Sequence, residues 1–386
     1  MKADESHYSH REWIQFGKRL DILCISITKL DYQKNIKMKY GTHQINRAGN
    51  TALTASDKRE FSEAIDIIND WRKLHLPALD NLQNQIVPLL KKYNVNIYSV
   101  SRRLKRIYSI LNKLDRNPQS RLGTMQDIGG LRIVVPSMTA LKKAYDIIVG
   151  NIPENFELTR EPIDYIKEPK RSSGYRSIHF VFKYHSTDVD LNGMKIELQL
   201  RTKLQHSWAM AVETAELITG TALKSSQGAE EWQDFFKIVS SLFAQQEQTP
   251  MMSEHRENNE TLKSLMQQLY QKNKKANFND TLKALSTTNL HARKVNYTDG
   301  YYILSINFVE KRLSIKPFPK ERESDASALY DRLEGMTEEN KNAVVLVSVP
   351  KIQQLQEAYP SYFLDTGEFF KAIDIRIKNC ERWGWV

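Results

Sequence analysis

Three segments of the chain place side chains that can do chemistry beside apolar, β-branched runs. In chain order they read DIGGLRIVV, PKRSSGYRSIHFVF and KIELQLRT. Asp127 opens the first segment, and Glu197 lies in the third, where Ile196, Leu198 and Leu200 alternate with polar residues as on a strand. Carboxylates bind divalent metals, and lysine and arginine neutralise phosphate oxygens. An acidic pair among many cations therefore predicts chemistry on phosphates.

Transfer of a phosphoryl or pyrophosphoryl group needs cations at the phosphates, Mg²⁺ held by carboxylates, and a group that acts on the attacking hydroxyl. We expect Asp127 to bind Mg²⁺, and Glu197 to bind the metal or act on the hydroxyl. The cations are expected from Arg103, Lys105, Lys113 and Arg132. For either acid taken alone, a salt bridge to a neighbouring arginine is the alternative. The sequence has neither a P-loop of the form GxxxxGKS or GxxxxGKT nor a glycine-rich kinase loop, which excludes a P-loop enzyme.

A tyrosine among cations forms a second candidate group. Tyr175 follows Gly174 in a loop that precedes a predicted strand, and such an exposed ring can stack on a base while guanidinium groups contact phosphates. The residues expected to bind the acceptor are Tyr175, His179, Lys170, Arg171 and Arg176. Two alternatives are a tyrosine folded back onto the strand and a histidine with purely structural hydrogen bonds.

The elements that must position these residues follow from periodicity. Apolar residues at helical spacing predict helices, and short β-branched runs predict strands. The predicted helices cover residues 57–92 with an interruption at Pro77, 97–114, 138–149, 204–218, 327–333 and 351–359. The predicted strands cover residues 131–135, 177–184, 195–200, 301–308, 312–318 and 343–349. Strands mixed with helices over the first part predict an α/β (α+β) domain.

Composition limits the class of protein. A chain of 386 residues with 40% hydrophobic and 26% charged residues is typical of a globular protein with two domains. No apolar run of ~18 residues occurs, and the N-terminus lacks the apolar core of a signal peptide, so we expect a cytoplasmic protein without a membrane span. The net charge of +10 favours anionic partners. Two cysteines, Cys24 and Cys380, are too few for a disulfide framework or a four-cysteine zinc site.

Four segments together carry a resemblance to a known family. RRLKRIYSILNKL, QDIGGLRIVV, DYIKEPKRSSGYRSIHF and IELQLRTKLQHSWA resemble the successive motifs of the RelA/SpoT synthetases, over about residues 102–216. The resemblance implies a nucleotidyltransferase-like mixed sheet flanked by helices, which transfers the β,γ-pyrophosphate of ATP to a ribose 3′-hydroxyl. It implies that Arg103, Lys105 and Lys113 bind ATP, and that Tyr175 and His179 serve the acceptor. The acidic pair keeps the roles given above.

The family divides by acceptor. Alarmone synthetases use GDP or GTP, whereas toxic small members, similar in motifs, modify the 3′ CCA end of tRNA and stop translation. No histidine in the chain is followed by aspartate, so the family's hydrolase motif is absent. We favour tRNA as acceptor, with alarmone synthesis as the alternative. A non-catalytic RNA- or protein-binding regulator is a third hypothesis, against which the intact acidic pair argues.

The C-terminal part resembles a regulatory domain. LQEAYPSYFLDTGEFF resembles the YxxY-bearing antitoxin portion of fused toxin–antitoxin synthetases, the CapRel-type antiphage proteins, whose pseudo-zinc-finger domain blocks the ATP site. The resemblance implies that Tyr359 and Tyr362 are autoinhibitory and that a phage structural protein, such as a capsid protein, releases them to cause abortive infection. Only His291 and Cys380 after residue 280 could bind zinc, so we expect no zinc site. The alternative is that both tyrosines pack a small core with Phe363.

The predicted domain boundaries combine these segments. We expect an N-terminal helical part and a synthetase core, followed by a helical linker and a small β-rich pseudo-zinc-finger domain. The respective ranges are 1–95, 96–245, 246–290 and 291–386. The C-terminal domain would restrain an enzyme that is otherwise harmful to its own cell.

Overall fold

A computed structural model describes most of the chain. The described residues are 37–105, 107–219, 227–276, 278, 300–307, 312–322, 325–326, 328–329, 332–333, 342–349 and 367–386. The chain forms two compact units. The first comprises Met1–Ile133, Lys142–Ile163 and His179–Leu200, and the second comprises Val134–Leu141, Asp164–Ile178 and Arg201–Val386. The predicted helix at 351–359, with Tyr359 and Tyr362, lies outside the described residues.

Three helices open the first unit. They are α2 (Thr42–Thr54), α3 (Lys58–Lys73) and α4 (Leu76–Lys92). The carboxylate of Asp57 accepts hydrogen bonds from the N–H groups of Arg59 and Glu60, which fixes the start of α3. Pro77 lies in the first turn of α4, where a proline lacks no helical hydrogen bond. The predicted interruption near Pro77 is therefore confirmed as the boundary between two helices.

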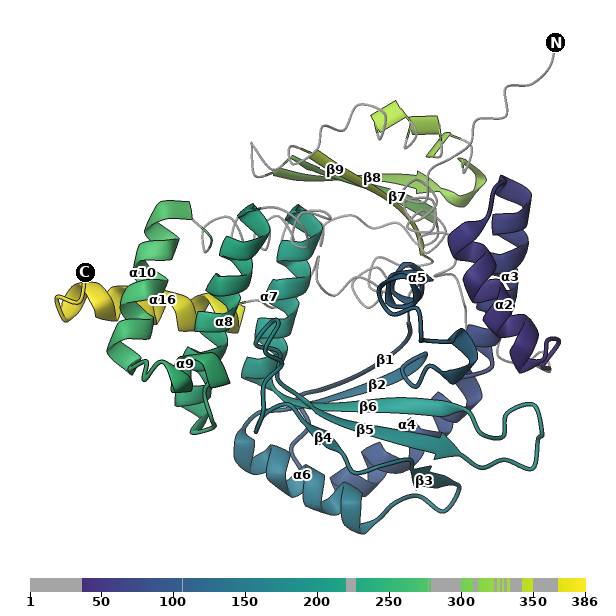
Figure 1. Cartoon of the computed structure of the whole chain (residues 1–386), viewed down its shortest axis with the longest axis horizontal. Coiled ribbons are helices and arrows are strands. Elements are labelled where there is room, and N and C mark those ends of the chain that lie inside the picture. Colours follow the sequence, from purple (N-terminus) through teal and green to yellow (C-terminus); the bar gives the residue numbers. More distant parts are fainter. Residues whose placement is uncertain are drawn as a thin grey trace. The chain divides into compact units, whose positions relative to one another are not determined.

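A mixed sheet flanked by helices forms the core that carries the candidate residues, as predicted. Its strands are β1 (Ser99–Leu104), β2 (Gly129–Val135), β3 (Phe156–Leu158), β4 (Ile163–Asp164), β5 (Ile178–Tyr184) and β6 (Lys195–Thr202). The order is β1-β2-β6-β5-β3, with β4 paired to β5. Helices α4 and α6 (Met138–Gly150) run along one face of this sheet (Figure 1). The neighbouring central strands β2 and β6 bring distant parts of the sequence together.

The prediction of one helix over residues 97–114 is wrong. Residues 99–104 form β1, and a helix, α5 (Ile107–Arg116), begins only after them. The segment NIYSVS is rich in strand-forming side chains, and pairing with β2 satisfies its backbone. Arg103 therefore lies near the end of a strand and Lys105 directly after it, and neither lies on a helix surface.

The second unit contains a helical bundle with one core. Its helices are α7 (Lys203–Thr219), α8 (Gln227–Glu247), α9 (Ser253–Glu257), α10 (Leu262–Ala276) and α16 (Gly367–Arg382). Phe235 and Phe243 of α8 and Phe369 of α16 are completely buried in this core. The last helix of the chain therefore packs with helices that begin more than a hundred residues earlier (Figure 1).

A separate three-stranded antiparallel sheet follows α10 in sequence. Its strands are β7 (Gly300–Asn307), β8 (Arg312–Pro319) and β9 (Asn342–Val349), in the order β8-β7-β9. Tyr301 pairs with Phe318 on β8 and with Ser348 on β9. The three strands predicted from the sequence in this part are confirmed.

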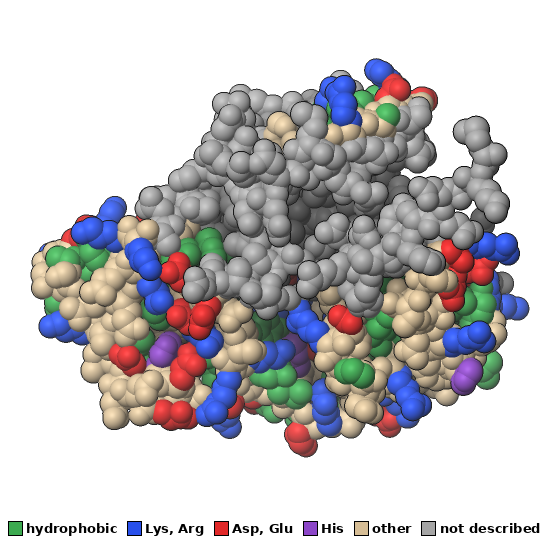
Figure 2. Space-filling view, turned by 45° about the horizontal axis from the view of Figure 1, so that its top comes forward, with side chains coloured by type: hydrophobic (Ala, Val, Ile, Leu, Met, Phe, Trp, Pro, Cys, Tyr) green, Lys and Arg blue, Asp and Glu red, His purple; other side chains and the backbone are tan. Residues whose placement is uncertain are grey.

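Two observations concern the described residues as a whole. On the face shown in Figure 2, lysine and arginine side chains are interspersed with aspartate and glutamate. Within the described ranges, every helix is too short or too polar to cross a bilayer.

A buried histidine joins α3 to α4. His75 is 1% exposed, and its Nδ1 lies 3.0 Å from the carbonyl oxygen of Trp71. Its ring meets the Trp71 ring edge-on, with centroids 4.8 Å apart. Burial lowers the pKa of His75 to about 4. The imidazole is therefore neutral in the folded protein at pH 7.

We expect this histidine to make stability pH-dependent. In the unfolded chain its pKa is about 6.5, so between pH 6.5 and 4 the unfolded state binds the proton and folding loses stability as pH falls. The free energy of unfolding should be lower by about 2 kcal/mol at pH 5 than at pH 7.5 from this group. Urea denaturation at both pH values measures the difference.

Two variants test the assignment. His75→Asn should reduce the difference, although His255, whose pKa burial also lowers, leaves a remainder of the same sign. His43→Gln, a change at an exposed histidine, is the matched control. An unchanged difference in His75→Asn would show that other groups cause the pH dependence.

Candidate functional site

Asp127 lies just before β2 and is paired with two lysines. Lys105 Nζ lies 2.8 Å from its Oδ2, and Lys113 Nζ lies 3.0 Å from its Oδ1. Burial by itself would raise the pKa of Asp127, but the charges of Lys105 and Lys113 hold it below its usual value. The side chain is therefore an ionised carboxylate at neutral pH. It also keeps two cations in place that a phosphate could recruit.

Glu197 occupies the polar side of β6. Ile196, Leu198 and Leu200 are completely buried, so the predicted alternation of this strand is confirmed. His179 Nδ1 lies 2.9 Å from Glu197 Oε1, and Gln199 donates a hydrogen bond of 2.6 Å to Oε2.

The environment of Glu197 keeps it ionised. Burial would raise the pKa of Glu197, but the hydrogen bonds and charge from His179, with the Gln199 hydrogen bond, lower it below its usual value. Repulsion by Asp127, which lies just before β2, the neighbour of β6, acts on the pKa of Glu197 in the opposite direction. The acidic pair predicted from two separate segments is therefore brought together.

These two carboxylates fit Mg²⁺ that arrives with a nucleotide. Among the described residues, no three or more histidine, cysteine, aspartate or glutamate side chains gather as a metal site. Mg²⁺ typically keeps several waters and uses one or two carboxylates together with substrate phosphates. Asp127 and Glu197 match that requirement. Two carboxylates are too few for a metal site in which the protein supplies every ligand.

Arg72 of α3 fixes the peptide of Lys105, which the sequence analysis missed. The N–H group of Lys105 donates to the Ile128 carbonyl at 2.7 Å, and its carbonyl accepts from Arg72 Nε at 2.8 Å. Arg72 is 8% exposed and also donates to Asn69 Oδ1 at 2.6 Å. The sequence contains a pattern that could have identified Arg72: it lies four residues after Ile68 and so falls on the apolar face of the helix. A basic residue on a buried face needs such a partner.

The other two residues predicted to bind ATP lie in the same unit. Arg132 lies on β2 and is 9% exposed. The backbone of Arg103 belongs to β1, but its side chain lies outside the description. Their contact with ATP stays a prediction.

Tyr175 and the predicted cations near it lie in the second unit, whereas His179 belongs to the first. The Tyr175 ring is half-buried and meets Tyr165 edge-on, with centroids 5.9 Å apart. Lys170 Nζ lies 5.1 Å from the Tyr175 ring centroid, and the guanidinium carbon of Arg201 lies 4.8 Å from it. Arg201 also donates to the Tyr175 hydroxyl at 2.5 Å. Of the predicted cations, Lys170 lies against the ring, and the ring is less exposed than expected.

Arg201 is a second residue of the site that the sequence analysis did not select. It is 3% exposed and follows Glu197 and Gln199 on the polar side of the alternating strand β6. The alternation predicts its place on the polar face, but no role was predicted for it. Its guanidinium lies over the Tyr175 ring, and the cation–π attraction helps to hold the ring in place.

Two predicted acceptor-binding arginines hold the loop of residues 164–176. Arg176 is 3% exposed, and it donates to Ser240 Oγ at 2.9 Å, to the Ile166 carbonyl at 3.1 Å and to the Pro250 carbonyl at 2.8 Å. Burial lowers the pKa of Arg176 to about 10, so it remains a cation at pH 7. This burial corrects the prediction that Arg176 contacts the acceptor, because its guanidinium is engaged inside the protein. Arg171 is exposed and pairs with Glu257 at 2.8 Å.

Comparisons with known proteins identify the central part of the chain. Residues 102–217 match a family model described as the region found in RelA / SpoT proteins. No curated protein matches the chain. Every residue predicted to act on ATP or on the acceptor lies inside the matched range.

Several solved structures are similar to about half of the chain. The small alarmone synthetase 1 from Bacillus subtilis, bound to its product pppGpp, is 26% identical, with 50% of this chain and 98% of that chain covered and a TM-score of 0.39. A GTP pyrophosphokinase family protein from Streptococcus pneumoniae is 22% identical, with 51% and 95% covered and a TM-score of 0.38. The small alarmone synthetase 2 from Bacillus subtilis is 23% identical, with 46% and 95% covered and a TM-score of 0.39.

Proposed function

With a RelA/SpoT region at residues 102–217 as the premise, we propose that the chain is an ATP-dependent pyrophosphotransferase. The observation that supports this best is the ionised, electrostatically coupled pair of Asp127 and Glu197, with Lys105 and Lys113 on Asp127. A binding protein has no need of two ionised acids beside two lysines. Phosphate chemistry needs both.

The proposed reaction joins an acceptor hydroxyl to the β-phosphorus of ATP. The hydroxyl oxygen forms a bond to that phosphorus, the bond from it to the oxygen bridging to the α-phosphate breaks, and AMP leaves. Glu197, held by His179, orients the hydroxyl and receives its proton. Lys105 and Lys113 move from Asp127 to phosphate oxygens. Mg²⁺, when bound by Asp127 and Glu197, neutralises charge on those oxygens.

For the acceptor we propose the 3′ CCA end of tRNA. The net charge of +10 favours a polynucleotide, and the half-buried Tyr175 ring, flanked by Lys170 and Arg201, suits a terminal base. GDP or GTP would use the same ring, so alarmone synthesis is the competing function. Modification of the tRNA end would stop translation and make the enzyme toxic.

Regulation is a further part of the proposal. We propose that the C-terminal part, through Tyr359 and Tyr362, blocks the ATP site until a phage structural protein binds. Such a trigger acts only if it binds the open state more tightly than the closed one, because a ligand shifts an equilibrium by its differential affinity. The proposed setting is the cytoplasm, and the outcome is abortive infection.

The acceptor is tested by label transfer. ATP labelled in the γ-phosphate is incubated with the full chain, or with Tyr359→Ala to release the proposed restraint, in the presence of deacylated tRNA, GDP or GTP. We expect label on tRNA, because transfer carries both the β- and γ-phosphates. tRNA oxidised with periodate, which lacks the 3′-hydroxyl, is the matched control and should stay unlabelled.

Other outcomes would change the assignment. Label on GDP or GTP alone would replace the tRNA proposal by alarmone synthesis. If neither form of the chain labels any acceptor, the non-catalytic regulator becomes the better hypothesis.

A further inference from the structure

The loop that carries Tyr175 is fastened by residues outside the matched RelA/SpoT region. Ser240 of α8 is 1% exposed. Its hydroxyl donates to the Gly174 carbonyl at 2.6 Å and accepts from Arg176 Nε at 2.9 Å. One buried hydroxyl therefore holds the residues immediately before and after Tyr175.

The backbone at Gly174 fits closely against this support. Gly174 has a φ of +81°, and a Cβ there would lie 2.9 Å from the Cβ of Ser240 and 3.1 Å from the sulfur of Met252. The N–H group of Gly174 donates to the Lys170 carbonyl at 2.7 Å, which closes a tight turn. Only glycine combines this conformation with so close an approach.

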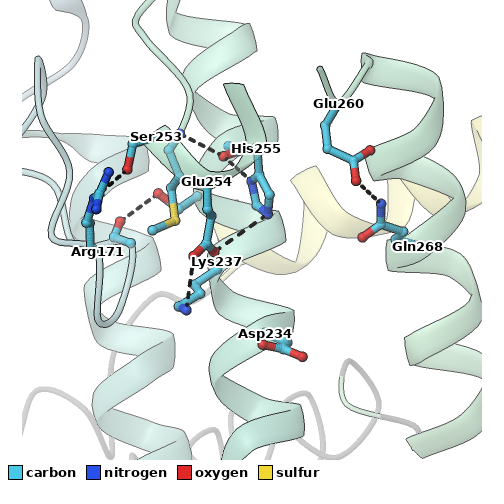
Figure 3. Close-up of polar contacts among 12 residues, drawn as sticks. Arg171, Asp234, Lys237, Ser253, Glu254, His255, Glu260 and Gln268 are labelled. Carbon is cyan, nitrogen blue, oxygen red and sulfur yellow. Dashed lines mark hydrogen bonds and ion pairs between the residues drawn. The ribbon is translucent and has the colours of Figure 1, made fainter. Parts of the chain in front are cut away.

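Helix α9 holds the same loop at a third place (Figure 3). Arg171 Nε donates to Ser253 Oγ at 3.0 Å. From the other side of α9, His255 Nδ1 lies 2.7 Å from Ser241 Oγ, and Glu254 pairs with Lys237 at 3.4 Å, both on α8. Helix α9 is thereby fixed to α8. We call residues 240–257 the α8–α9 support.

We propose that Ser240 is a positioning residue for the acceptor, acting through Tyr175, and that the α8–α9 support is a required part of the acceptor site. This inference rests on the proposed pyrophosphotransferase function. Ser240 holds the peptide that precedes Tyr175 through the Gly174 carbonyl, and it holds the guanidinium of Arg176, which follows Tyr175; both contacts limit where the ring can point. A ring displaced by a fraction of an ångström loses stacking with the acceptor base, whereas ATP is bound by residues of the other unit.

The substitution Ser240→Ala tests the proposal. It removes the partner of a buried carbonyl and of a buried guanidinium. We expect the KM for the acceptor to rise about tenfold, while the KM for ATP stays within about twofold of the wild-type value. Ser207→Ala is the matched control, because Ser207 is also buried in the bundle but its hydroxyl donates to Leu204 of its own helix. It should leave both KM values unchanged.

Hydrogen–deuterium exchange provides a readout that does not need activity. Ser240→Ala should speed exchange in residues 164–176, and Ser207→Ala should not. If neither the wild-type chain nor Tyr359→Ala transfers label to any acceptor, the proposed function fails, and the exchange result alone then decides whether the support holds the loop. Unchanged exchange, or an acceptor KM equal to that of the wild type, would overturn the proposal.

A second variant covers the case in which Ser240→Ala does not fold. Ser253→Ala removes one of the two partners of Arg171 on α9 and leaves the pair with Glu257. It should raise the acceptor KM about threefold and speed exchange in the same loop. If Ser253→Ala changes neither quantity, the α8–α9 support does not position the acceptor.

Discussion

Replacing Glu197 by glutamine should lower the rate of pyrophosphate transfer by about 10²–10⁴-fold and leave the fold intact. Glutamine has nearly the same shape, so it can keep contacts with His179 and Gln199. It cannot receive the hydroxyl proton and is a poor ligand for Mg²⁺. Single-turnover transfer from labelled ATP measures the rate, and thermal unfolding followed by circular dichroism verifies the fold.

Asp127→Asn should cause a loss of similar size for a different reason. The neutral amide no longer attracts Lys105 and Lys113, and it binds Mg²⁺ weakly. Asp146→Asn, at an exposed acid on α6, is the control for a simple change of charge. If Glu197→Gln retained the wild-type rate, or stayed toxic to cells, the acidic pair would have no catalytic role and a binding function would be favoured.

Removing α16 should unfold the helical bundle of the second unit. Phe369 packs against Phe236 and Phe243, with ring centroids 6.1 and 5.8 Å away, and Ile373 is completely buried beside them. Truncating a buried phenylalanine to alanine costs about 3–5 kcal/mol. Losing the whole helix would cost an amount comparable with the total stability of a domain, about 5–15 kcal/mol. A chain ending at residue 366 should therefore be insoluble or show no cooperative thermal transition.

The matched variant keeps α16 and removes the intervening segment. Residues 281–366 are replaced by a short glycine–serine linker, so that α10 and α16, which pack together, both remain. We expect this variant to unfold cooperatively at a temperature near that of the full chain. Its effect on cell growth then tests autoinhibition without damage to the enzyme. A soluble, cooperatively unfolding chain of residues 1–366 would contradict the role given to α16.

The sequence was sufficient to predict the features that depend on local pattern. The alternation around Glu197 predicted its polar face, and the β-branched run predicted a strand at 131–135, which in the structure begins two residues earlier, at Gly129. The error at residues 97–114 arose because helical spacing from Ile107 onwards was extended backwards, while β1 forms only by pairing with a strand distant in sequence. Local propensity could not show that pairing.

The features that the sequence did not predict depend on distant partners. Burial of Arg176 is possible because Ser240 and Pro250 accept its hydrogen bonds, and neither is near it in the chain. The amphipathic pattern of α16 is visible in the sequence, but the aromatic core that it completes belongs to α8. The role of Arg72 likewise depends on its hydrogen bond to the carbonyl of Lys105, a residue distant in the sequence.

The pairing of Asp127 with Lys105 and Lys113 has a consequence for how ATP enters. Without nucleotide, the cations of this site already have a counter-charge supplied by the protein. Binding of a magnesium–nucleotide complex is then a double exchange, in which the metal takes the carboxylate and the phosphates take the lysines. Since few salt ions need to be displaced from the two lysines, the affinity for ATP depends only weakly on ionic strength. If the proposed function holds, we expect ATP binding to persist over a wide range of salt concentrations.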